Sequence, residues 1–108
     1  MKHISYSFSD SDIEAIAFAL SILPSLELEE TEAQATINYQ CCCSAIEKLF
    51  KHDTNIMPNE FRVILSSLQI VQLINNGKLE VEQETKRECN GYLFTVNKLL
   101  SVFNKQMS

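Results

Sequence analysis

The stretch that decides the fold is PNEFRVILSSLQIVQLINNG, residues 58–77. Its apolar residues recur every three or four positions, which is the spacing of an α-helix rather than of a strand. Pro58 suits the first helical turn, where its missing N–H costs no hydrogen bond. Gly77 readily adopts the left-handed conformation that commonly ends a helix. The stretch therefore predicts a helix over residues 58–74.

Helical patterns on both sides of this stretch predict three more helices, over residues 11–23, 29–50 and 82–104. The first has a capping-box spacing at Ser11 and Glu14, and Pro24 ends it. The chain has only 2 Gly and 2 Pro, too few for the many turns of a sandwich or barrel. Helices joined by short connections favour antiparallel neighbours. The sequence thus predicts one all-α domain over its 108 residues, an antiparallel four-helix bundle.

The helical pattern does not determine the structure of two short segments or the role of one glycine. Residues 3–8 alternate apolar and polar side chains, so residues 1–9 form either an extended arm or a short strand. Residues 78–82 alternate in the same way and would pair with such a strand. Inside the last helix, Gly91 costs about 1 kcal/mol relative to alanine and marks either a kink or a close contact.

Two of the predicted helices carry apolar residues on two faces. In the helix over 58–74, the main apolar stripe has a second apolar set roughly opposite to it. Large exposed apolar patches are uncommon on monomers, so we expect part of this surplus to contact another protein, either a partner or a second copy in a homodimer. The residues assigned to this contact are Phe18, Ile22, Val63, Ile70 and Ile74.

The chain is acidic, with a net charge of −5 from 14 acidic and 9 basic residues. This balance argues against binding to nucleic acid or to an anionic membrane surface. Its simplest role is solubility, and it also suits a basic protein partner. The densest acidic cluster includes Glu29, Glu30 and Glu32, which either stabilise the start of a helix or form a docking patch.

Cysteine is the other unusual feature, with Cys41, Cys42 and Cys43 in a row and Cys89 further on. Successive helical residues point about 100° apart, so three in a row cannot converge on one metal ion. Cys42 and Cys89 fall on helical apolar stripes and are predicted to be small core residues, with Cys43 at the edge and Cys41 outward. The predicted core stripe around Cys42 comprises Ala35, Tyr39, Ile46, Leu49 and Phe50.

The sequence contains no catalytic motif and no cofactor or metal signature. His52 beside Asp53 is most simply a histidine favoured by the dipole at a helix end. No secretory signal is visible, and the longest uncharged run falls short of the roughly 20 apolar residues that span a bilayer. The cytoplasm, where thiols stay reduced, is the expected compartment.

These features predict a small acidic protein that binds another protein and catalyses nothing. It would act as an inhibitor, an immunity or antitoxin-like protein, or an adaptor, a range suggested by size and charge alone. One alternative is a structural homo-oligomer without a heterologous partner. The other is a thiol or metal-binding protein that uses Cys41–Cys43 together with Cys89.

Overall fold

The computed structural model describes residues 8–22, 31–53 and 55–107 of the chain. Over these residues the chain forms four helices and no strand, which confirms the all-α, four-helix prediction. The helices are α1 (Asp10–Ile22), α2 (Glu32–Phe50), α3 (Pro58–Asn75) and α4 (Gln83–Met107).

The observed helix bounds lie close to the predicted ones where the structure describes them. The predicted helix start at residue 29 and most of the arm or strand over residues 1–9 lie outside the described residues. Residues 78–82, the other candidate strand, form a bend and a short loop between α3 and α4.

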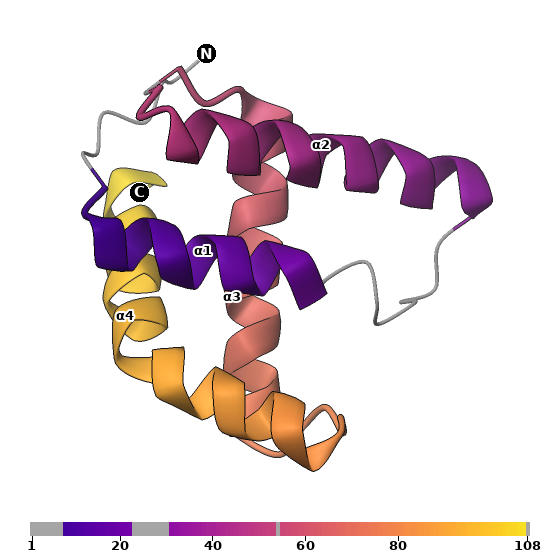
Figure 1. The fold of residues 1–108 in the computed structure, drawn as a ribbon, viewed down its shortest axis with the longest axis vertical. Helices are drawn as coiled ribbons and strands as arrows, with labels where there is room; N and C mark the ends of the chain where they lie inside the picture. The colour runs from indigo at the N-terminus through magenta and orange to yellow at the C-terminus, as the bar shows by residue number, and fades with distance from the viewer. Residues whose placement is uncertain (1–7, 23–30, 54, 108) are drawn as a thin grey trace.

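Figure 1 shows how the helices are arranged: α1 and α2 run antiparallel to each other and cross the antiparallel pair α3 and α4. α1 and α3 each contact the other three helices. Over their described residues, α2 and α4 do not contact each other. The middle of the molecule is therefore built by α1 and α3, with α2 and α4 on separate sides.

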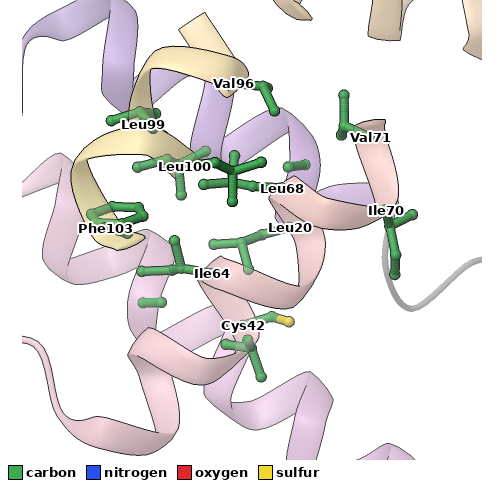
Figure 2. Packing of buried hydrophobic residues seen from close by; sticks show 14 of the residues in the cluster. Leu20, Cys42, Ile64, Leu68, Ile70, Val71, Val96, Leu99, Leu100 and Phe103 are labelled. Carbon is green, nitrogen blue, oxygen red and sulfur yellow. The ribbon is translucent and has the colours of Figure 1, made fainter. Parts of the chain in front are cut away.

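Side chains from all four of these helices fill the core (Figure 2). Ala15 and Ala19 of α1 are completely buried, and their small side chains let neighbouring helices approach closely. Burying one Ile, Leu or Phe side chain contributes about 1.5–3 kcal/mol, so this cluster supplies most of the stability. Its largest fully buried members include Phe103, Ile16, Leu20, Leu49, Ile64, Leu68 and Ile74.

The two-faced pattern of α3 reflects burial within the chain, and the assignment of its second face to a partner is wrong. Val63, Ile70 and Ile74 are only 3%, 8% and 0% exposed. The physical reason is that α1, α2 and α4 all pack against α3, so it has apolar neighbours on most of its circumference. A helix surrounded in this way needs apolar residues on more than one face.

The N-terminal cap of α1 differs from the predicted one by two residues. The Ser9 N–H donates to Asp12 Oδ2 over 3.1 Å, and the Asp12 N–H donates to Ser9 Oγ over 3.2 Å. This reciprocal pair is a capping box in which aspartate replaces the usual glutamate, and the predicted Ser11–Glu14 box does not form. The Asp12 side chain fits this role because it is buried and fixed from a second side, by α4.

At the end of α3 the predicted left-handed glycine is present, since Gly77 has φ of 75°. The Gly77 N–H donates to the Ile74 carbonyl over 3.2 Å, and the Lys78 N–H donates to the Leu73 carbonyl over 2.9 Å. These two bonds form a Schellman motif that satisfies the last carbonyls of the helix. Of the helices described, none has the length and apolar character needed to cross a membrane.

Candidate protein-binding surface

The other residues predicted to contact a partner lie in three different settings. Phe18 is half-buried and stacks on Tyr92 of α4, with ring centroids 4.7 Å apart. Ile22 is half-buried and packs against the core. Glu29 and Glu30 lie outside the described residues, and Glu32 is the first residue of α2. The members of the predicted set whose side chains the structure describes therefore do not form one exposed surface.

The cysteines of α2 point in different directions, in an order that corrects the predicted one. Cys42 is buried as expected, and Figure 2 includes it in the core. Cys43 is the exposed one, whereas Cys41 is half-buried and packs against the core. The inward face of α2 is thus centred on Cys42, Ala45 and Leu49, and is rotated away from the predicted stripe.

This rotation leaves an apolar face of α2 in solvent. Tyr39 is 58% exposed and Phe50 is 62% exposed, although both were predicted to be core residues. Exposed Cys43 lies between them, and half-buried Ile46 borders the same side of the helix. Their spacing of 4 and 7 residues places Tyr39, Cys43 and Phe50 on one stripe. We call Tyr39, Cys43, Ile46 and Phe50 the α2 stripe.

A hollow of about 310 Å³ lies at the C-terminal end of the α2 stripe, between α1 and the end of α2. Phe50 belongs to both the stripe and the hollow, so the two form one continuous surface. Its wall is partly apolar, and two carboxylates of α1 stand on one helical face four residues apart. The residues lining it are Asp10, Ile13, Glu14, Ala17, Phe50 and His52.

His52 reaches the hollow because the backbone turns sharply there. Its φ of 56° places it in the left-handed region. The His52 N–H donates to the Leu49 carbonyl over 3.1 Å, and the Asp53 N–H donates to the Lys48 carbonyl over 2.9 Å. α2 therefore ends in a Schellman motif like that of α3, with histidine where glycine is usual. His52 therefore lies at the end of α2, as predicted, and its backbone forms part of the helix cap.

The side chains around the α2 stripe give it a mixed electrostatic character. A hydrogen bond and attraction between Glu47 and Lys51, with Nζ and Oε1 2.7 Å apart, lower the pKa of Glu47 and raise that of Lys51. Within the stripe, the hydrogen bond between Tyr39 and Cys43 raises the pKa of Tyr39. At the hollow, Glu14 accepts a hydrogen bond of 3.1 Å from the Tyr92 hydroxyl. The hollow therefore has two carboxylate side chains in its wall, while the stripe itself contains no Asp, Glu, Lys or Arg.

Two buried carboxylates hold the helices that carry this surface. Asp12 of α1 pairs with Lys98 of α4, with Oδ1 and Nζ 2.7 Å apart. Glu60 of α3 pairs with Lys48 of α2 at 2.7 Å and accepts a hydrogen bond from the Ser44 hydroxyl. Each carboxylate is nearly fully buried, so these bonds join helices and compensate the cost of burying the charge.

Neither the thiols nor the other ligand-type side chains form a metal site in the part of the chain that the structure describes. No group of three or more His, Cys, Asp or Glu side chains in that part is placed to hold an ion. None of the four cysteines is in a disulfide bond, and Cys89 lies on α4, which α2 does not contact over its described residues. Burial, followed by repulsion from Glu88, raises the pKa of the Cys89 thiol, so this thiol stays protonated.

The exposure of Tyr39 and Phe50 was missed because α2 has apolar residues around most of its circumference. Either Tyr39 with Phe50 or Cys42 with Leu49 forms a regular helical stripe, and spacing alone does not choose between them. The available signal was side-chain size. Cys42 and Ala45 are small, which favours the close approach of α1 and α3 on their side of the helix.

Comparison of the chain with family models, curated proteins and solved structures gave no significant match. The functional conclusion therefore rests on the chemistry of the surface formed by the α2 stripe and the α1–α2 hollow.

Proposed function

We propose that this protein is a non-catalytic interaction module that binds another protein through the α2 stripe and the adjoining α1–α2 hollow. The observation that carries the proposal is the exposure of Tyr39, Cys43 and Phe50 on one stripe that runs into this hollow. Aromatic side chains are the residues that most often dominate binding energy at protein interfaces. A contact of this kind suits an inhibitor, an immunity or antitoxin-like protein, or an adaptor.

The chemistry of the hollow defines the partner that fits it. Ile13, Ala17 and Phe50 provide an apolar wall, and Asp10 and Glu14 provide two negative charges at its rim. A partner segment with an apolar side chain next to a lysine or arginine would satisfy both. The net charge of −5 would also speed the approach of a basic protein. The expected setting is the cytoplasm, as inferred from the sequence.

Substitutions of the exposed aromatic residues test this proposal. Phe50→Ser and Tyr39→Ser each remove apolar contact area from the α2 stripe without opening a cavity, because both side chains are exposed. The partner is first captured with the wild-type chain, identified and purified, and its affinity is then measured by calorimetry. We expect each substitution to weaken binding about tenfold or more, as for an interface hot spot.

Ile37→Ser is the matched control, since Ile37 is 48% exposed on the same helix but lies off the stripe. It should leave the affinity unchanged. Asp10→Asn with Glu14→Gln should slow association and weaken its salt dependence. Equal affinity for the wild type, Phe50→Ser and Tyr39→Ser would show that the partner binds elsewhere and would overturn the proposal.

The homo-oligomer alternative uses the same α2 stripe and is separated by sedimentation of the purified chain alone. Two copies of α2 packed through Tyr39 and Phe50 would bring the two Cys43 thiols near the symmetry axis. Self-association that Phe50→Ser abolishes and that permits a Cys43–Cys43 cross-link would favour this alternative. A monomer at high micromolar concentration would exclude it.

A further inference from the structure

A second hollow lies between the C-terminal end of α3 and the first turns of α4. Its volume is about 340 Å³. All of its lining side chains are polar, two are cationic and none is a carboxylate. The lining residues are Asn75, Gln83, Lys86, Arg87 and Asn90.

The two cations of this hollow lie in an acidic chain in which several lysines are paired. Lys48, Lys51 and Lys98 each pair with a carboxylate at 2.7 Å. Lys86 and Arg87, by contrast, have no ion-pair partner among the residues that the structure describes. Their positive charge is therefore not neutralised within that part of the chain, although the net charge is −5.

The acidic residues of α4 do not compete for the hollow. At about 100° per residue, Gln83, Lys86 and Asn90 fall within one narrow sector of the helix. Glu84 and Glu88 project well over 90° away from the centre of that sector. An anion in the hollow would thus meet the ammonium and guanidinium groups before it met these carboxylates.

The wall of the hollow is fixed, and two amides remain available. Asn75 Nδ2 donates to the Val71 carbonyl over 3.1 Å and to the Cys89 carbonyl over 3.2 Å, which ties α3 to α4 beside the hollow. Gln83 and Asn90 are exposed and make no side-chain hydrogen bond within the described residues. Their N–H groups are free to donate to an anion, in addition to the charged donors of Lys86 and Arg87.

One turn beyond Asn90, about 6 Å along the helix axis, lies the most exposed large apolar residue of the described chain. This residue is Phe94, and it is 83% exposed. Gly91, between the two, has no side chain, and an added methyl group there would meet nothing within 4 Å. Asn90 and Phe94 are four residues apart and share one face of α4, so the Phe94 ring lies next to the residues of the hollow.

We propose that this hollow binds an oxyanion, a phosphate or carboxylate group, of a ligand whose apolar or aromatic part covers Phe94. Lys86 and Arg87 supply the charge, Gln83 and Asn90 supply further donors, and Phe94 supplies the stacking surface. The site is separate from the α2 stripe because α2 and α4 do not contact each other over their described residues. The oxyanion site therefore does not depend on the proposed function.

The test is a titration of the full-length, isotope-labelled protein followed by backbone amide NMR. Inorganic phosphate and acetate separate the two oxyanion types, and sodium chloride at equal ionic strength controls for screening. We expect phosphate, acetate or both to shift the amides of residues 83–91 and of Asn75 in a saturable manner. Phenyl phosphate or benzoate should bind about fivefold more tightly than the matching simple anion, because stacking contributes about 1 kcal/mol.

Charge-neutralising variants make the test specific. Arg87→Gln and Lys86→Gln should each weaken oxyanion binding about fivefold, and Phe94→Ser should remove only the advantage of the aromatic ligands. Arg62→Gln is the matched control, since Arg62 is an exposed cation on α3 outside the hollow, and it should change nothing.

Two outcomes of the anion titration would overturn the oxyanion site: no saturable shift with either anion, or equal shifts with chloride, which indicate an adventitious ion only. Binding that is unchanged in both Arg87→Gln and Lys86→Gln would also overturn it. Oxyanion binding without any gain for phenyl phosphate or benzoate would overturn the role of Phe94.

Discussion

His52 and Gly77 occupy equivalent positions, two residues past the last residue of a helix, and both have positive φ. For a residue with a Cβ, the left-handed conformation costs about 1–2 kcal/mol, whereas glycine adopts it freely. His52 therefore carries backbone strain that Gly77 avoids. Gly91 is the opposite case, because it lies inside α4, where its backbone needs no special conformation.

Three substitutions measure this difference. Gly77→Ala should lower the free energy of unfolding by about 1 kcal/mol, because alanine must adopt φ of 75° there. His52→Gly should raise it by about 0.5 kcal/mol, as the relief of strain exceeds the gain in unfolded-state entropy. Gly91→Ala should also raise it, by up to about 1 kcal/mol, since a helix interior favours alanine. Urea unfolding gives all three values, and a stabilising Gly77→Ala would contradict this account of the caps.

The exposure of each cysteine determines how fast a thiol reagent modifies it. Native-state labelling with a thiol reagent should modify Cys43 first, Cys41 more slowly, and Cys42 and Cys89 last, because the last two are 3% and 0% exposed. Mass spectrometry after short labelling times gives the order. Labelling of Cys41 ahead of Cys43 would indicate that α2 is rotated relative to the described helix.

At the scale of elements, the second apolar face of α3 was predicted to be a binding surface and is buried instead. Ile74→Ala should lower the free energy of unfolding by about 2–5 kcal/mol, since Ile74 is completely buried and its truncation leaves a cavity. Leu73→Ala is the control, as Leu73 is 40% exposed on the same helix and should cost far less. Equal effects of the two substitutions on the free energy of unfolding would contradict the buried position of Ile74.

α2 differs from its prediction in the opposite direction, since residues predicted to be buried are exposed. Its contacts with α1 and α3 use the side with small residues, and Tyr39 and Phe50 remain in water. α4 also leaves an aromatic residue, Phe94, in water. If both proposals hold, the molecule presents an apolar, acid-rimmed surface on α2 and an oxyanion site on α4, which an adaptor would use at the same time.

At the scale of the whole molecule, the buried carboxylates Asp12 and Glu60 make the free energy of unfolding depend on pH. Burial alone raises the pKa of each, but for Asp12 the hydrogen bonds from Lys98 and Ser9 outweigh burial and hold the pKa below its usual range. For Glu60 the hydrogen bonds from Lys48, Ser44 and the Met57 N–H have the same net effect. Both carboxylates are therefore more acidic in the folded chain than in the unfolded chain.

The resulting prediction is a loss of stability in acid. The contribution of these groups is fully present above their unfolded pKa values of about 4 and is lost as pH falls through the lower folded values. Urea unfolding between pH 7 and pH 3 should show this decline. Asp12→Asn and Glu60→Gln should each cost about 1–3 kcal/mol at pH 7 and flatten the decline. An unchanged pH dependence in both variants would show that other groups control acid unfolding.

The sequence by itself determined the features that depend on neighbours along the chain. Helical periodicity, Pro58 at the start of α3 and Gly77 at its end act over a few residues, so the four-helix, all-α class and most helix bounds followed from them. The inward position of Cys42 and Cys89 also followed, because each lies on a regular apolar stripe. The N-terminal cap of α1 was misplaced by two residues, since several Ser and Asp side chains there offer similar caps.

Only the tertiary structure decided which apolar faces are buried. The packing of three helices around α3 turned Val63, Ile70 and Ile74 into core, and the rotation of α2 put Tyr39 and Phe50 in water. The physical reason is that burial depends on contacts between helices far apart in sequence, whereas the periodicity of one helix is compatible with more than one rotation about its axis. The candidate surfaces on α2 and α4 exist because of that choice.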